Sequence, residues 1–363
     1  MGISIATAPC CWGVDDVRNT KLPPWERVFD EAVAAGYKGL ELGPYGYVPL
    51  DRGRVAGALE ERGLSIVAGT IFDDLVSPSN SENLLKQTDE ICALISSLPP
   101  VAPFEGQRFP TPYLTVMDWG HGERDYAAGH SDAAPRLSDA AWAGMVANIK
   151  AIADLARTKF GVRAVIHPHA GGYIEFADEI RRIAQGVPKE TAGFCIDTGH
   201  TLYAGMEPVR TLEDDADRLD YIHFKDIDAR VYADVMGRRI RFFEACAEGV
   251  MCPIGRGVID YPAIPLAPGP HRLPGLHHRR TGARSRERRR QPRRREGEPR
   301  LFAQRRILSR PEEECSMIVG KRRTEKPIRW AMVGGGAGSQ IGYIHRSAAL
   351  RDRTFDLVAG AFG

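Results

Sequence analysis

The sequence has no long apolar stretch, since none of its hydrophobic runs approaches the ~20 residues that a membrane-spanning helix requires. The opening residues MGISIATAPCCWG lack the basic start and the long apolar core of a secretory signal. Seven cysteines occur without even spacing or a CxxC pair, which argues against a disulfide framework and a zinc knuckle. These absences predict a soluble protein of the reducing cytoplasm that has no membrane partner.

Excess charge is also lacking, because the net charge is only +2 and the whole molecule is therefore not expected to bind polyanions. Arginine nevertheless dominates one region, and no lysine occurs between Lys225 and Lys321. Arms that bind phosphates usually mix both cations, because lysine serves as well as arginine as a point charge. Nucleic acid is therefore an unlikely partner of this region.

The arginine-rich region has the composition of GC-rich DNA read out of frame. Codons for residues 275–287 can be chosen so that reading one nucleotide later gives GFITVEQERDPE, which looks like a barrel strand. The same frame continues to a stop codon across Leu308–Ser309. We interpret residues 264–316 as a disordered, frameshifted segment that begins near Ile264–Ala267. A disordered basic tail and an RNA-binding arm are the alternatives.

Short apolar runs alternate with helix-like segments through the first 260 residues. Strands are expected at 3–9, 38–43, 64–72, 113–118, 163–169, 192–197 and 219–226. They are apolar throughout, which is typical of a buried parallel sheet. Seven βα units predict an α/β fold over residues 1–263, a (β/α)8 TIM barrel that lacks a proper eighth unit. A doubly wound sheet is the alternative, but polar residues follow many strands and not one switch point.

The last part of the chain, residues 317–363, reads as strand, glycine turn, helix and strand. Gly334, Gly336 and Gly338 would let the backbone approach a pyrophosphate at a helix N-terminus. This pattern resembles the opening of the glucose–fructose oxidoreductase and inositol dehydrogenase family. The resemblance implies a truncated Rossmann-like, dinucleotide-binding fragment without a substrate domain. It looks like the start of a neighbouring gene and, by analogy, favours a role in inositol catabolism.

Residues suited to metal binding or proton transfer follow three successive strands. They are His167, His169 and Glu175 in VIHPHAGGYIE, Asp197 and His200 in CIDTGHTLYAG, and His223, Lys225 and Asp226 in YIHFKDID. In a barrel they would converge on one mouth and could hold a divalent metal such as Mn²⁺, Co²⁺, Mg²⁺ or Zn²⁺. Structural interpretations remain open: hydrogen-bonded histidines, Asp197 as a helix cap, and a surface ion pair between Lys225 and Asp226.

The motifs HPHAGGYIE, DTGH and HFKD, in this order and spacing, resemble the xylose-isomerase-like barrel superfamily of sugar-phosphate isomerases and epimerases. Within it they are most similar to the inosose dehydratases. The superfamily implies a metal held by Glu, Asp, His and Glu from strands five to eight. Asp197 and His223 match the second and third ligands. The first is His167 by strand position or Glu175 by residue type, and the fourth occurs only in the alternative frame, across the codons of Arg280 and Thr281.

The resemblance implies an enzyme that abstracts a proton beside a ketone of a polyol-derived substrate and then expels a β-hydroxyl. His200 and Lys225 are the candidate catalytic groups, and Lys225 could also bind the oxyanion. His167, His169 and Glu41 are candidates for substrate binding, although Glu41 could equally lie on a helix-facing surface.

Other readings of the chain stay open. Trp12 and Trp119 could wall the pocket or simply pack. A sugar or sugar-phosphate isomerase or 3-epimerase is the alternative activity, and a nucleic-acid-binding protein is the second alternative. A homo-oligomer is compatible with the sequence. Loss of strand eight predicts that the chain as written is inactive.

Overall fold

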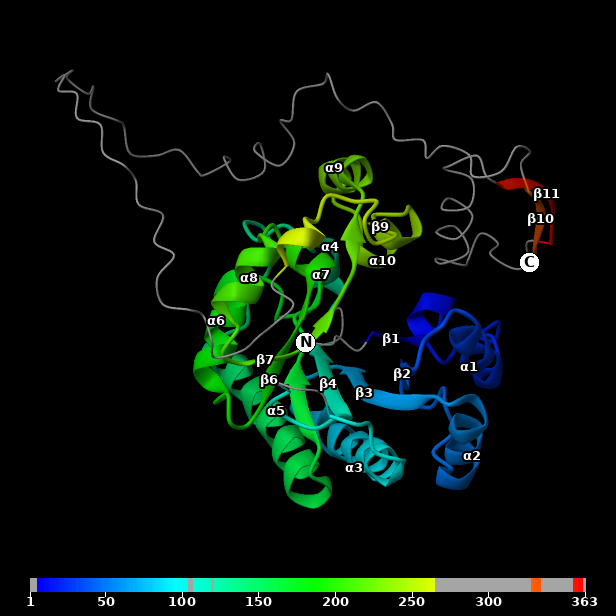
Figure 1. The fold of residues 1–363 in the computed structure, drawn as a ribbon. Helices are drawn as coiled ribbons and strands as arrows, with labels where there is room; N and C mark the ends of the chain where they lie inside the picture. Colours follow the sequence, from blue (N-terminus) through cyan, green and yellow to red (C-terminus); the bar gives the residue numbers. More distant parts are fainter. Residues whose placement is uncertain (1–4, 104–106, 119–120, 265–327, 334–354, 362–363) are drawn as a thin grey trace, which may run out of the picture.

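The computed structural model describes residues 5–103, 107–118, 121–264, 328–333 and 355–361 (Figure 1). Its centre is a seven-stranded parallel sheet in which the strands follow one another in chain order. The strands are β1 (Ala6–Thr7), β2 (Gly39–Glu41), β3 (Ser65–Asp73), β4 (Tyr113–Asp118), β5 (Arg163–Ile166), β6 (Gly193–Asp197) and β7 (Leu219–His223). This order confirms the predicted barrel-like fold without an eighth unit, and it is not the order of a doubly wound sheet.

Helices pack outside the sheet and connect its strands, as Figure 1 shows. They are α1 (Trp25–Ala34), α2 (Arg52–Arg62), α3 (Ser81–Ser97), α4 (Gly122–Tyr126), α5 (Asp139–Phe160), α6 (Ala177–Gly186), α7 (Thr198–Tyr203), α8 (Pro208–Asp214), α9 (Ala229–Arg238) and α10 (Phe242–Ala247), with short 3-10 helices η1 (Pro9–Trp12), η2 (Pro78–Asn80) and η3 (Tyr261–Ala263). Local sequence sets their ends: the side chain of Ser138 accepts a hydrogen bond from Ala141 N, and Gly161 takes a left-handed conformation after α5. No helix of the described residues is both long and apolar enough to cross a bilayer.

The sheet stays open between β1 and β7, which form its two edges within the described residues. After β7 the chain forms β8 (Asp226–Ile227), which pairs in antiparallel fashion with β9 (Met251–Cys252). The gap is bridged inside the barrel, because Glu41 Oε1 at the end of β2 lies 2.8 Å from both Tyr221 Oη and His223 Nε2 of β7. These side-chain contacts link β2 and β7 in a sheet that no eighth strand closes in the part of the chain that the structure describes.

Asp226 anchors the loop that follows β9. Its buried carboxylate accepts hydrogen bonds from the backbone N–H groups of Ile227, Gly255, Gly257 and Ile259 at 2.9–3.1 Å. The interpretation of Lys225 and Asp226 as a surface ion pair is therefore wrong, because Asp226 is buried and Lys225 pairs with Asp197. Four backbone donors give a buried carboxylate the partners that it needs.

The chain beyond the barrel is described at two strands only, β10 (Ile328–Val333) and β11 (Phe355–Ala361), which pair in parallel. The glycine turn and helix expected between them lie outside the described residues, as does the arginine-rich segment after Ile264. The proposed division into 1–263, 264–316 and 317–363 therefore stays a prediction.

A buried guanidinium connects two loops at the carboxyl end of the sheet. Arg124 of α4 is fully buried, donates to Gly172 O at 2.6 Å and contacts both carboxylate oxygens of Glu179 at 3.0 Å. It thereby ties the connection after β4 to the connection after β5, which carries His167 and His169. The cluster fixes one wall of the barrel mouth.

Replacing Arg124 by methionine is expected to lower the free energy of unfolding by about 3–5 kcal/mol, because Glu179 then stays buried beside fewer positive charges. The matched control is Arg157→Met, which removes an exposed pair with Asp154 and should cost under about 1 kcal/mol. Urea unfolding followed by far-ultraviolet circular dichroism measures both. Equal unfolding midpoints for the two variants would show that the buried cluster does not stabilise the fold.

Candidate active site

The carboxyl ends of four strands carry the candidate site. Asp197 ends β6, His223 ends β7, Glu41 ends β2, and His167 directly follows β5. Asp197 and His223 are opposite each other in the register of β6 and β7. The structure therefore places His167, Asp197 and His223 at one mouth and adds Glu41 to them, since the carboxyl ends of parallel strands meet there.

Asp197 lies at the centre of the site and uses its two oxygens for different purposes. Oδ1 accepts hydrogen bonds from the backbone N–H groups of Gly199 at 2.8 Å and His200 at 2.9 Å, and so caps α7. Oδ2 forms an ion pair with Lys225 Nζ. Burial alone would raise the pKa of this carboxyl, but Lys225, His200 and His167 together outweigh burial and hold the pKa well below its usual value. Asp197 thus serves both as the cap of α7 and as the central residue of the candidate site.

His167 presents two buried ring nitrogens that have no hydrogen-bond partner among the described residues. Its Nε2 lies 3.6 Å from Asp197 Oδ2, and its ring centroid lies 4.9 Å from that of His223. Burial lowers the pKa of His167 to about 4, so the imidazole is neutral at neutral pH and offers a lone pair. Because buried polar atoms are rarely left unsatisfied, these nitrogens indicate a missing ligand.

His223 is oriented from behind by Glu41. Its Nε2 faces Glu41 Oε1 at 2.8 Å, and its Nδ1 lies 3.9 Å from Asp197 Oδ2. A carboxylate that holds the outer nitrogen of an imidazole is typical of metal-binding histidines. Burial alone would lower the pKa of His223, but Cys195 and Glu41 raise it well above its usual value, so a metal would have to displace a proton from this ring to bind it.

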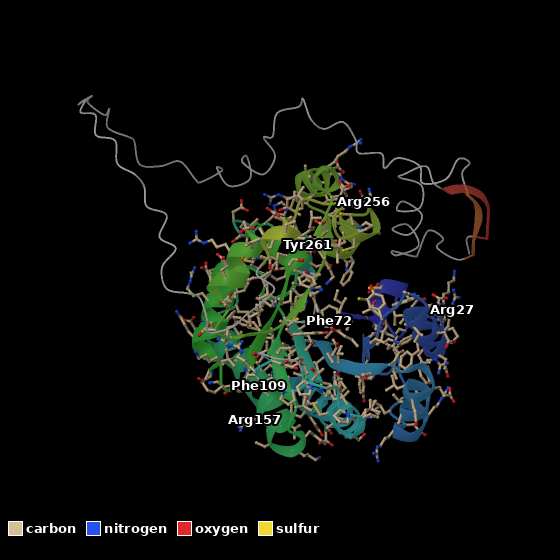
Figure 2. All side chains as sticks on the ribbon, viewed as in Figure 1. Arg27, Phe72, Phe109, Arg157, Arg256 and Tyr261 are labelled. Carbon is tan, nitrogen blue, oxygen red and sulfur yellow. The ribbon has the colours of Figure 1, made fainter. Side chains whose placement is uncertain are left out.

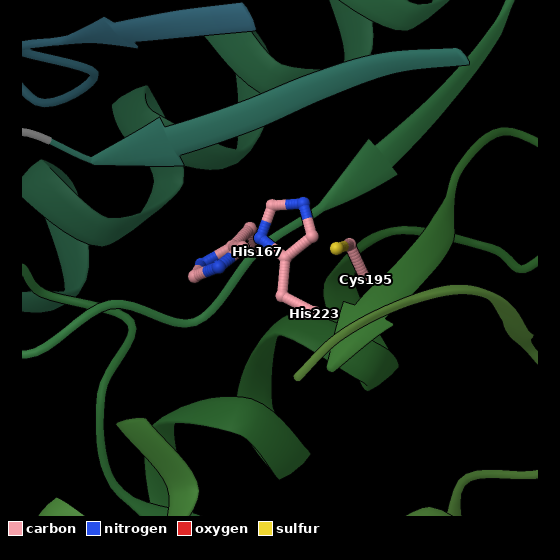
Figure 3. Close-up of side chains that lie close together, drawn as sticks. All are labelled: His167, Cys195 and His223. Atoms are coloured by element: carbon pink, nitrogen blue, oxygen red, sulfur yellow. The ribbon is translucent and has the colours of Figure 1, made fainter. Parts of the chain in front are cut away.

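These residues fit a divalent metal. Two sets have ligand atoms that lie within 4.8 Å of one another: His167, Cys195 and His223, shown in Figure 3, and His167, Asp197 and His200. Ligand atoms about 2.1 Å from a tetrahedral metal lie about 3.4 Å apart, close to the 3.6 Å between His167 Nε2 and Asp197 Oδ2. The imidazole and carboxylate donors suit Zn²⁺, Mn²⁺ or Co²⁺.

Glu175 lies apart from this group. Its carboxylate accepts hydrogen bonds from Gly129 N at 2.7 Å and Gly171 N at 3.0 Å, and it contacts Arg124 at 3.4 Å. Burial raises the pKa of Glu175 to about 8. The structure therefore brings Asp197 and His223 to His167 and does not bring Glu175 to them.

The rings of two further histidines, His169 and His200, lie beside the centre with their centroids 4.0 Å apart and their planes tilted by 40°. The nitrogen Nδ1 of His169 lies 2.9 Å from Ala170 O, and Ala170 N donates to Nδ1 of His200 at 3.1 Å. Burial lowers the pKa of His169 to about 3 and that of His200 well below its usual value. Both rings are therefore neutral at neutral pH.

Glu41 is nearly buried, which excludes the helix-facing surface position, and its Oε1 lies within hydrogen-bond distance of Tyr221 and His223. Its substrate-binding role stays a prediction beside this orienting one. Trp12 donates to Glu31 Oε2 at 2.7 Å, which supports packing over lining the pocket, and Trp119 lies outside the described residues.

Several residues near the site were not expected from the sequence. Cys195 and Tyr221 lie two positions before Asp197 and His223 and could have been found from the alternation of side chains along a strand. Phe72, labelled in Figure 2, lies 4.9 Å from the His169 ring, and Phe242 lies 4.9 Å from the His200 ring. Phe242 comes from a distant helix, and no local pattern marks it.

A separate group of possible ligands lies at the ends of β3 and β4 and consists of Asp74, Asp118 and His121. The carboxylate of Asp118 already accepts hydrogen bonds from Leu75 N at 3.2 Å and Tyr173 N at 2.7 Å. His121 Nε2 lies 3.1 Å from both oxygens of Asp118. These contacts explain why the three residues lie together: they hold the loops that follow β3 and β4 in place.

Comparison with known proteins places this geometry in context. The family model of the xylose isomerase-like TIM barrel matches residues 29–265. The rhizopine catabolism protein MocC of Rhizobium meliloti is 28% identical over 267 residues, covering 73% of this chain and 77% of the relative. An inosose dehydratase of Lacticaseibacillus casei is 25% identical over 269 residues, covering 73% of this chain and 84% of the relative.

Solved structures share the fold. The probable 3-DHS dehydratase AsbF involved in petrobactin synthesis, from Bacillus anthracis, superposes with a TM-score of 0.53 at 14% identity, covering 72% of this chain and 87% of that chain. An L-ribulose 3-epimerase superposes with a TM-score of 0.50 at 15% identity, covering 72% of this chain and 76% of that chain. At these identities the likeness concerns the fold.

Proposed function

Because the chain belongs to the xylose isomerase-like TIM barrel family, we propose that its barrel is built to dehydrate an inosose, a polyol-derived ketone, with the help of a divalent metal. Relatives that include inosose dehydratases support the wider class of sugar-modifying enzymes. The observation that carries the proposal is the pair of buried, unpartnered nitrogens of His167 beside Asp197.

His167, Asp197 and His223 would hold the metal. When bound, the metal supplies a Lewis acid that polarises the ketone oxygen and acidifies the neighbouring C–H. Lys225 would stay charged beside Asp197 and face the negative charge that develops on the substrate oxygen. Glu41 would keep the His223 ring in place through its outer nitrogen.

The tautomers of His169 and His200 assign their roles. A carbonyl oxygen can only accept, so Nδ1 of His169 carries the proton and Nε2 of this neutral ring has a lone pair. A backbone N–H can only donate, so Nδ1 of His200 is bare and its Nε2 carries the proton. The two neighbouring rings therefore offer one hydrogen-bond acceptor, Nε2 of His169, and one hydrogen-bond donor, Nε2 of His200.

His169 Nε2 would take the proton from the carbon beside the ketone and pass it to the β-hydroxyl, which leaves as water, while the Nε2–H of His200 donates a hydrogen bond to that hydroxyl. A base as weak as His169 can act only on a C–H that a polarised carbonyl has acidified. Because His169 takes and returns the same proton, both rings end in the state in which they began. Of the two roles predicted for Lys225, proton transfer and binding of the oxyanion, the proposal uses the second.

The proposed activity is tested by incubating the chain with its eighth strand restored with an inosose and Mn²⁺ or Co²⁺. Dehydration creates a conjugated carbonyl, and its ultraviolet absorbance should rise with time and stop when a chelator removes the metal. A 3-epimerase would change the sugar without creating this chromophore, so epimerised product without absorbance would support the alternative activity.

The first metal ligand can be decided by two variants. His167→Ala is expected to weaken metal binding by at least about tenfold, whereas Glu175→Gln should leave it unchanged, because Glu175 contacts the loop and Arg124. Isothermal titration with Co²⁺ measures both. Loss of binding in Glu175→Gln with binding kept in His167→Ala would assign the ligand to Glu175 and contradict the proposed site.

Replacing His200 by alanine is expected to lower kcat by about 10²–10⁴-fold, because the leaving hydroxyl loses the group that donates a hydrogen bond to it. Metal content should not change, since His167, Asp197 and His223 remain. The measurement combines steady-state dehydration of an inosose, in the chain with its eighth strand restored, with metal analysis. A variant that loses metal and activity together would indicate that His200 is a ligand.

A further inference from the structure

Two adjacent cysteines stand on the short 3-10 helix η1, directly after β1. Cys11 is exposed and Cys10 is half-buried. The helix is held at both ends, because Cys11 N donates to Ala8 O at 2.9 Å and Gly13 N donates to Cys10 O at 3.0 Å. Gly13 ends it in a left-handed conformation with φ of 79°. The two thiols therefore have a fixed position at the carboxyl end of the sheet.

The two thiols belong to neighbouring residues of η1, and each affects the pKa of the other. Their side chains are hydrogen-bonded, and Cys11 also receives hydrogen bonds from Thr7 and Ala8. Hydrogen bonding from Cys10 lowers the pKa of Cys11 to about 6, and the charge of Lys225 acts in the same direction. The same hydrogen bond raises the pKa of Cys10. At neutral pH the pair is one thiolate and one thiol, the form in which the sulfur of Cys11 is a strong nucleophile and ligand.

The proposed dehydration does not use these thiols, although both interact electrostatically with Lys225 at the site. The other described cysteines differ from this pair. Cys92 and Cys195 are fully buried in separate strands or helices, and Cys246 and Cys252 lie half-buried beyond β7. Among the described residues, only η1 carries two neighbouring cysteines, one of them exposed.

We propose that Cys10 and Cys11 form a two-sulfur binding site for a soft, thiophilic centre at the rim of the barrel mouth. The chemical class that fits is a trivalent arsenical or a similar soft cation, which two thiolates bind together. In the reaction with an arsenoxide, the thiolate of Cys11 and the thiol of Cys10 form two As–S bonds, and the oxygen takes the Cys10 proton and one proton from solvent and leaves as water. No oxidation state changes, so no further reactant is required.

The experiment uses the full chain and phenylarsine oxide as the probe, with binding read by intact mass and by mapping of the labelled peptide. The wild-type chain should take up one phenylarsenic group on the peptide that holds residues 10 and 11. Cys10→Ser and Cys11→Ser should each weaken binding by about 100-fold or more, because the second sulfur no longer binds within the same molecule. Cys246→Ser and Cys315→Ser should bind as the wild type does.

Alkylation with iodoacetamide separates the pair from a single reactive thiol. Cys11 should be alkylated faster than Cys92 at pH 6.5, and bound phenylarsine oxide should prevent this. Circular dichroism checks that the serine variants stay folded. Tight binding that survives Cys10→Ser or Cys11→Ser, or that is lost in Cys246→Ser, would overturn the proposal, as would the absence of binding to the folded wild-type chain.

Discussion

Reading the codons after Ile264 one nucleotide later is expected to raise the rate of inosose dehydration by about 100-fold or more, because the change restores a metal ligand. The restored sequence includes GFITVE, read from the codons of residue 275 onward, and would supply a strand between β1 and β7, the edges of the sheet in the described residues. Open sheet edges expose unpaired N–H and C=O groups that pair with other chains. Closing the barrel should therefore also raise the yield of soluble protein.

The glutamate of GFITVE is expected to be the fourth ligand. Without it the metal has one fewer anionic partner beside His167, Asp197 and His223. It therefore binds more weakly and polarises the ketone less. A restored chain in which this glutamate is glutamine separates the two effects: soluble yield should stay high while metal content and activity fall.

The measurement compares three proteins, which are the chain as written, the restored chain and its glutamine variant, for soluble yield, metal content and dehydration in the presence of Mn²⁺ or Co²⁺. Resequencing the DNA around codons 260–270 shows which frame the organism uses. If the chain as written and the restored chain behave alike in all three assays, the arginine-rich segment is a working part of the protein.

Asp197→Asn is expected to abolish dehydration in the restored chain and to weaken metal binding by at least about 10–100-fold. Asparagine has the same shape and can still accept hydrogen bonds from Gly199 N and His200 N, so α7 keeps its cap. What is lost is the negative charge that faces Lys225 and lies 3.6 Å from His167 Nε2. The variant thus tests the charge separately from the fold.

Metal titration and circular dichroism on the same preparation measure this effect. Asp154→Asn, on the exposed face of α5, is the matched control and should change neither metal binding nor activity. An Asp197→Asn protein that is folded and binds Co²⁺ as tightly as the wild type would show that Asp197 is only a helix cap.

The parallel sheet could be predicted from the sequence because its strands are short apolar runs, each followed by polar residues. Asp197 and His223 were identified for the same reason, since each ends such a run. The first metal ligand was not decided, because HPHAGGYIE places His167 and Glu175 at the two ends of a turn. Which of them faces the centre depends on Arg124, which contacts Glu175 from a different connection.

Contacts across the barrel could not be predicted from local patterns. Glu41 and His223 are 182 positions apart, and only the curling of the open sheet brings Glu41 against the outer nitrogen of that ring. The partner of Lys225 was equally hidden, because sequence adjacency suggests Asp226 whereas the strand register brings Asp197 to it. In both cases the arrangement of the strands determines which side chains pair, and the local sequence does not.

The backbone N–H and C=O groups of Ala170 determine how the site tolerates mutation at this position. Its carbonyl and its N–H fix the protons of His169 and His200, and neither group belongs to a side chain. Substitutions at residue 170 therefore meet only a packing limit, because the residue is buried and every replacement except proline keeps both groups. Proline would remove the N–H and free the tautomer of His200 alone. Replacement of Ala170 by proline would thus affect His200 and not His169, without altering either ring.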